Sequence, residues 1–97
     1  MRLALYSSTT RRDEPNYVAI QDPALTAVPT VLVCPMLRQM EWADFRAKVE
    51  WGDATYIVAC DLARPVHRQG LRQIGELSEK QSTAVMKAFG ELLARDL

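Results

Sequence analysis

Residues 29–36 read Pro-Thr-Val-Leu-Val-Cys-Pro-Met. Residues 30–34 are mostly apolar or β-branched, a composition typical of strands. Pro29 and Pro35 lack backbone N–H donors, so we expect them to limit the strand at its two ends. An apolar run this short, bounded by proline on both sides, predicts a short β-strand rather than a helix.

Other short apolar runs on both sides of this strand predict a mostly antiparallel sheet. Turn dipeptides separate the runs, among them Asp22-Pro23 and Gly52-Asp53. The expected strands cover residues 3–6, 17–20, 45–51 and 55–60, and a last short strand would contain Leu71 and Ile74. Between positions 45 and 51 apolar and charged residues alternate, which predicts a half-buried strand.

The C-terminal part of the chain predicts a helix over about 78–95. Ser78 and Gln81 have the spacing of a capping box, in which the Ser78 hydroxyl accepts from the amide three residues later and Gln81 reaches back. Apolar residues then recur at helical spacing, at Val85, Ala88, Phe89, Leu92 and Leu93. We expect this stripe to pack on the sheet. The fold class is thus mostly β with a C-terminal α-helix, in one domain covering 1–97.

Composition excludes several classes of protein. The chain has 97 residues, 12 Lys+Arg and 12 Asp+Glu, so a net charge of zero excludes a protein that holds nucleic acid by bulk positive charge. No apolar run approaches the length of a membrane span, and the N-terminus does not resemble a signal peptide, so we expect a cytoplasmic protein without membrane contact. Cys34 and Cys60 each lie among apolar residues, which favours buried free thiols over a disulfide.

Few residues suggest catalysis by themselves. His67 is the one histidine, and it lies at 63–70, where we expect an exposed connection. It is either a surface histidine in a basic loop or a general acid or base. The spacing of histidine, cysteine and carboxylates predicts no metal site, and the glycines form no phosphate-binding loop. We therefore expect no metal and no cofactor.

Local basic charge is the stronger signal. No acid lies between Asp61 and Glu76, whereas that interval holds Arg64, His67, Arg68 and Arg72. Further arginines are Arg11 and Arg12 in the first polar loop and Arg38 after the 30–34 strand. If these segments fold side by side, the arginines form a basic face that can bind a polyanion. The alternative is that they are surface charges exposed to solvent without a binding role.

The two tryptophans suggest different roles. Trp51 alternates with Val49, which favours core packing or a dimer contact. Trp42 lies in a less regular stretch and is the better candidate for an exposed contact with a partner or a base.

Two stretches together resemble the MazF/PemK toxins. The first covers 18–36 (VAIQDPALTAVPTVLVCPM); the second covers 60–66 (CDLARPV) and then 71–79 (LRQIGELSE). The chain is also similar to the gyrase poison CcdB in its first strand ending in Tyr6 and in its strands around 18–21 and 31–36. Both resemblances imply an SH3-like small barrel with a C-terminal helix, a homodimer, and neutralisation by a cognate antitoxin.

The resemblance implies a toxin of a type II toxin–antitoxin module that acts as a metal-independent endoribonuclease on single-stranded RNA. One alternative is a CcdB-like poison of DNA gyrase without enzymatic activity. Another is a non-toxic binding module of the same fold. The chain lacks the C-terminal Trp-Gly-Ile of the gyrase poisons and ends instead in Arg95-Asp96-Leu97.

The family's two catalytic positions are substituted. The Arg before the second strand falls on Glu14 or Pro15, and the Ser/Thr after the third falls on Leu37 or Arg38. The expected catalytic residues are therefore Arg11, Arg12 and Arg38, acting on phosphate. The expected substrate-binding residues are Arg64, His67, Arg68 and Trp42.

Overall fold

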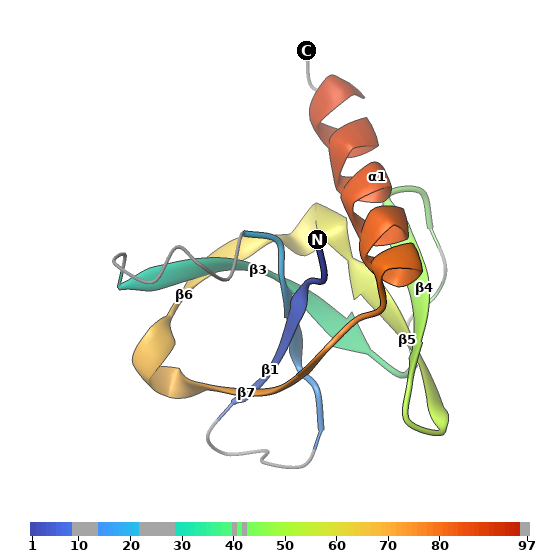
Figure 1. The fold of residues 1–97 in the computed structure, drawn as a ribbon. Helices are drawn as coiled ribbons and strands as arrows, with labels where there is room; N and C mark the ends of the chain where they lie inside the picture. The colour runs from blue at the N-terminus through green and yellow to red at the C-terminus, as the bar shows by residue number, and fades with distance from the viewer. Residues whose placement is uncertain (9–13, 22–28, 40, 42, 96–97) are drawn as a thin grey trace.

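Seven short strands and a C-terminal helix make up the described part of the chain (Figure 1). This computed structural model describes residues 1–8, 14–21, 29–39, 41 and 43–95. The strands are β1 (Ala4–Ser8), β2 (Tyr17–Ala19), β3 (Thr30–Leu37), β4 (Arg46–Trp51), β5 (Ala54–Ala59), β6 (Arg64–His67) and β7 (Leu71–Glu76). Two 3₁₀ turns, η1 (Cys60–Leu62) and η2 (Arg68–Gly70), flank β6, and α1 (Glu79–Arg95) follows β7. The mostly β class with a C-terminal helix is confirmed.

Strand β3 is shared by three antiparallel partners. On one edge it pairs with β2, with Val18 opposite Cys34. On its other edge it pairs first with β6, from Thr30 to Val33, and then with β5, at Met36 and Leu37. The sheet order is β4-β5-β3-β2-β1-β7, with β6 beside β3. The sheet curls around its core because one long strand changes partner along its length.

The expectation that Pro35 ends the third strand is wrong. Pro35 lies within β3 and is opposite Tyr17 of β2. The Met36 amide bonds to the Asn16 carbonyl on the β2 side, at 2.9 Å, so the Pro35 nitrogen faces the other edge. On that edge the pairing of β3 with β6 stops at Val33, and the pairing of β3 with β5 starts at Met36. The missing donor thus falls where no ladder bond is needed.

The expected connection at 63–70 also contains a strand. Residues Arg64–His67 form β6, and the turn η2 follows it. Among the described residues β6 pairs with β3 alone, so it is an edge strand, where proline at Pro65 is tolerated. The charged and proline-containing sequence of β6 lacks the apolar alternation that identifies a strand.

Strand β4 begins one residue later than expected. Phe45 precedes the strand with φ of 68°, a left-handed conformation that is unusual for a bulky residue. From Ala47 onward the expected alternation holds, with Ala47 and Val49 buried. The Gly52-Asp53 turn joins β4 to β5, and Gly52 takes a φ of 62° that favours glycine.

Side-chain packing brings the two ends of the curled sheet together. A Cβ built on Gly75 of β7 would lie 3.2 Å from Nε1 of Trp51, at the end of β4. No ladder joins β4 to β7 within the described ranges, so this contact closes the structure where backbone pairing does not. Trp51 therefore has the expected core role, since it packs on the buried cluster.

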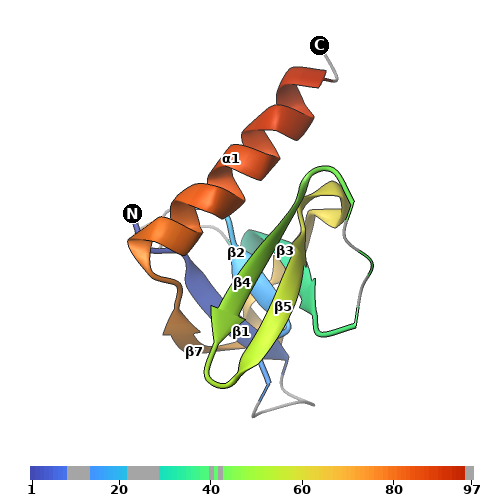
Figure 2. The same cartoon turned by 90° about the vertical axis from the view of Figure 1, so that its right-hand side faces the viewer.

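Helix α1 lies across the open side of the curled sheet and continues beyond it (Figure 2). Ser78 caps it as expected, accepting from the Gln81 amide at 3.2 Å, but Gln81 itself accepts from the Glu50 amide of β4 at 2.9 Å. The second half of the expected capping box is thus replaced by a tie to the sheet. The apolar stripe is buried at Val85, whereas Leu93 is 52% exposed.

The N-terminal segment is fixed against the helix start by buried hydrogen bonds. The Leu3 amide donates to Oγ of Ser82 at 2.9 Å, and the Leu77 amide donates to the Leu3 carbonyl at 2.8 Å. The free, buried thiols expected at Cys34 and Cys60 are confirmed. Cys60 and burial together raise the pKa of the Cys34 thiol, which keeps it protonated.

Replacing Gly75 tests how the sheet is closed. We expect Gly75→Val to lower the free energy of unfolding by about 1–3 kcal/mol, because its side chain must displace the Trp51 ring. Gly90→Ala is the control, since nothing lies within 4 Å of its Cβ position and alanine favours a helix by up to about 1 kcal/mol. Urea unfolding measures both variants. A Gly75→Val protein as stable as the wild type would contradict this closure.

Candidate nucleic-acid interface

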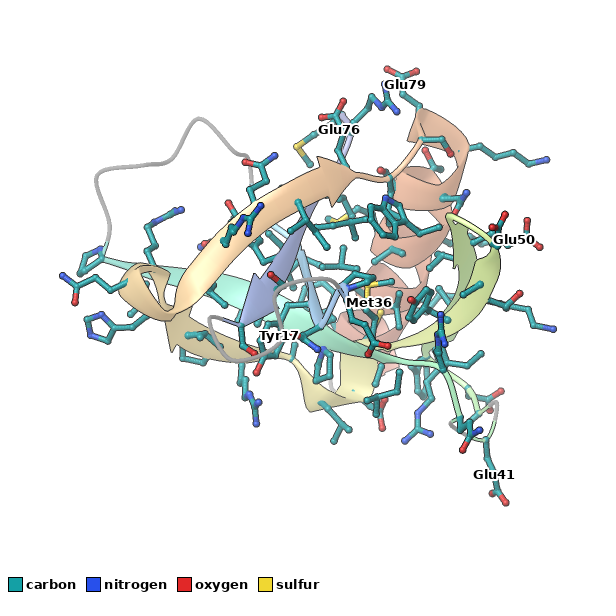
Figure 3. All side chains as sticks on the ribbon, turned by 90° about the horizontal axis from the view of Figure 1, so that it is seen from below. Tyr17, Met36, Glu41, Glu50, Glu76 and Glu79 are labelled. Atoms are coloured by element: carbon teal, nitrogen blue, oxygen red, sulfur yellow. The ribbon has the colours of Figure 1, made fainter. Side chains whose placement is uncertain are left out.

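Two adjoining hollows lie at the C-terminal end of β3, and they share Asn16, Met36 and Leu37. The Arg38 hollow, of about 270 Å³, is lined by Glu14, Pro15, Asn16, Met36, Leu37, Arg38, Gln39 and Tyr56. The Arg64 hollow, of about 380 Å³, is lined by Ser8, Asn16, Tyr17, Pro35, Met36, Leu37, Leu62 and Arg64. Figure 3 shows Tyr17 and Met36 close together on this side of the molecule.

Asn16 fixes the chain between the two hollows. Its amide donates to the Tyr6 carbonyl at 2.8 Å, and its carbonyl accepts from Met36 at 2.9 Å. Its side-chain oxygen accepts from the Ser8 amide at 2.8 Å. These bonds connect the ends of β1, β2 and β3. They hold Glu14, two residues before Asn16, along the same hollow as Arg38.

Arg38 is held against an aromatic ring. Its guanidinium carbon lies 5.6 Å from the centre of the Tyr56 ring, a cation–π distance. Tyr56 is only 4% exposed and belongs to β5, so it is a rigid support for a side chain that is otherwise exposed. The hydrogen bond to Tyr56, with a smaller contribution from the Glu14 carboxylate, raises the pKa of Arg38. Arg38 therefore stays charged in this hollow, which the Glu14 carboxylate also lines.

Arg64 has a similar arrangement in the second hollow. Its guanidinium carbon lies 5.7 Å from the centre of the Tyr17 ring, and Nη2 donates to the Tyr17 hydroxyl at 3.1 Å. Each hollow thus presents one guanidinium group positioned by a tyrosine. Leu37, 44% exposed, lines both hollows. Two oriented cations beside an exposed apolar side chain fit a phosphodiester strand with unpaired bases.

A further arginine fixes the segment that follows the Arg38 hollow. Arg46 donates to both carboxylate oxygens of Asp61, each at 3.1 Å, and to the Glu41 carbonyl at 3.0 Å. The fork joins the start of β4 to η1, and it lowers the pKa of Asp61.

The structure brings together only some of the basic residues expected at the site. Arg38 and Arg64 line the adjoining hollows. His67 pairs with Thr30, at the opposite end of β3. Thr30 is seven residues from Leu37, so the two ends lie roughly 23 Å apart along the strand. Arg68 follows His67 in η2 and is equally remote. Arg11, Arg12 and Trp42 lie outside the described residues.

Sequence reasoning missed the groups that orient the arginines. Tyr17 and Tyr56 were interpreted only as strand residues, and Asn16 was not considered. Glu14 entered only as the residue that replaces an expected arginine. Tyr17 is the first residue of β2, and a tyrosine at the end of a strand can support an arginine with its ring. Tyr56 lies within β5 opposite Val49 and belongs to the buried core, so no local pattern marks it as such a support.

Among the described residues, no group of three or more histidine, cysteine, aspartate or glutamate side chains could hold a metal ion. The same part of the chain contains no helix with the length and apolarity to cross a membrane.

Comparison with solved structures supports the expected fold. Toxin MazF-mt6 of Mycobacterium tuberculosis superposes with a TM-score of 0.74 at 18% identity, covering 97% of each chain. A second structure, described as an Mtb toxin, gives a TM-score of 0.72 at 19% identity, covering 94% of this chain and 98% of the other. No family model and no curated protein sequence matches the chain. At these identities the likeness establishes the fold.

Removing Asp61 tests the fork. The pKa of Asp61 is lowered in the folded state, so unfolding at low pH takes up a proton and the contribution of Asp61 to stability is lost as pH falls through that pKa. We expect Asp61→Asn to be less stable than wild type at pH 7, with the gap closing below about pH 4, near the ordinary aspartate pKa. Asp53→Asn is the control. Urea unfolding at pH 7 and below about pH 4 measures the difference in stability between Asp61→Asn and wild type. A difference that does not change with pH would contradict the stabilisation of the Asp61 carboxylate by Arg46.

Proposed function

We propose that this chain, which has the fold of MazF toxins, is the toxin of a type II toxin–antitoxin module and cleaves single-stranded RNA without a metal ion. The observation that supports it most strongly is the pair of tyrosine-backed arginines, Arg38 and Arg64, in adjoining hollows. An RNA strand carries its phosphates on the outside and its bases unpaired, so it can use both guanidinium groups and the exposed Leu37.

The proposed chemistry is attack of the ribose 2′-hydroxyl on the adjacent phosphorus. Negative charge then develops on the non-bridging phosphate oxygens, and a fixed guanidinium in a hollow is suited to stabilise it. Arg38 has this role, and Arg64 holds a neighbouring phosphate. Arg11 and Arg12, which precede Glu14 in the sequence, are proposed to contact phosphate as well. No metal is needed, because the nucleophile belongs to the RNA itself.

The proposed partners follow from the same fold. Two solved toxin structures share it, which supports a cognate antitoxin as the neutralising partner. A homodimer is supported by the exposed Leu93 on the part of α1 that continues beyond the sheet (Figure 1), because a second copy would remove this apolar surface from water. The proposed location is the cytoplasm, where messenger RNA is available.

Cleavage of RNA by the purified chain tests this proposal. We expect cuts in a long single-stranded RNA that persist in excess EDTA. Arg38→Gln should lower the cleavage rate about 100-fold, the usual effect of removing one donor to a developing oxyanion. Lys80→Gln, which removes a positive charge from the first turn of α1, should cut like wild type. Intact RNA at high protein excess, together with trapped gyrase–DNA complexes, would overturn the ribonuclease function in favour of a gyrase poison.

A further inference from the structure

We infer that the Glu14 carboxylate is the proton acceptor of the cleavage reaction, an inference that rests on the proposed ribonuclease function. By resemblance, the family's catalytic arginine falls on Glu14 or Pro15. Neither residue is basic, and Glu14 adds a carboxylate to the lining of the hollow. Arg38, which lines the same hollow, is the cation among its described lining residues.

Geometry places the two groups in complementary positions. Glu14 precedes β2 and Arg38 follows β3, and both line the Arg38 hollow because Asn16 ties these two segments together through the Met36 amide. The Glu14 carboxylate is close enough to Arg38 to act on its charge. A phosphodiester bound to Arg38 therefore has a carboxylate beside its ribose.

Among the described residues that line the two hollows, no other side chain can take this role. Their described linings contain one carboxylate, Glu14, and no histidine. The two tyrosines are engaged in supporting the arginines. Asp61 is engaged by Arg46, and Glu76 forms an ion pair with Arg2 at 3.3 Å. Figure 3 shows Glu76 and Glu79 far from Tyr17 and Met36.

The proposed step balances in atoms and charge. The carboxylate of Glu14 takes the proton of the 2′-hydroxyl while the 2′-oxygen forms a bond to the adjacent phosphorus. Charge on the non-bridging oxygens is stabilised by Arg38. The bond from phosphorus to the 5′-oxygen then breaks, and the departing oxygen takes a proton from solvent water. The products are a 2′,3′-cyclic phosphate and a 5′-hydroxyl, and Glu14 returns its proton to solvent.

Glu14→Gln tests this role. We expect cleavage to fall at least about 100-fold, since positioned general bases contribute roughly 10² to 10⁴. The acid limb of the pH–rate profile, which protonation of the base produces, should disappear in the residual activity. Glu14→Asp should recover part of the rate. Glu50→Gln, which neutralises an exposed carboxylate of β4, is the matched control and should cut like wild type.

A binding measurement separates chemistry from folding. A single-stranded DNA analogue lacks the 2′-hydroxyl and cannot be cut by this route, so it reports binding alone. Glu14→Gln should bind it at least as tightly as wild type, because a negative charge has been removed. If wild type cuts RNA and Glu14→Gln cuts equally fast, the inference fails and the ribonuclease function stands. If wild type leaves RNA intact, both fail.

Discussion

The pairing of β3 with three strands is the constraint on which the rest of the structure depends. Its first half pairs with β6 and its last two residues pair with β5, while β2 occupies the opposite edge. Pro35 lies at the change of partner, where its missing donor is not needed. This exchange turns the sheet and lets Trp51 reach Gly75. It also leaves the end of β3 as the point where β2, β5 and the segment before β6 meet.

The candidate site is a consequence of that meeting point. Asn16 ties β1, β2 and β3 together, so Glu14 and Arg38 come from different parts of the sequence to one hollow. Tyr17 of β2 and Tyr56 of β5, the two strands that flank the end of β3, hold the two guanidinium groups. Rigid strands thus carry the groups that position the arginines. Among their described lining residues, the hollows combine two fixed cations, one carboxylate and two exposed leucines, Leu37 and Leu62. The proposed binding of a phosphodiester strand uses this set.

Much of the fold was predictable because its strands are short apolar runs between turn residues. The helix was predictable from Ser78 and the stripe that begins at Val85. Strand β6 was not, since an edge strand needs no apolar alternation and tolerates Pro65. Local charge identified Arg38 and Arg64 as candidate site residues. It could not show that His67 lies apart from them, because long-range strand pairing decides which end of β3 each residue reaches. The roles of Asn16 and Tyr56 also depend on this pairing, so no local pattern indicated them.

If RNA binds at the C-terminal end of β3, the backbone amides there should respond to it. The experiment is to titrate the chain with a single-stranded oligoribonucleotide, whose 2′-oxygens are methylated to prevent cleavage, and to record amide NMR spectra. We expect the largest shifts at Asn16, Leu37, Arg38 and Arg64, with little change at His67 and Arg68. Shifts concentrated at His67 and Arg68, or along α1, would mean that RNA binds elsewhere.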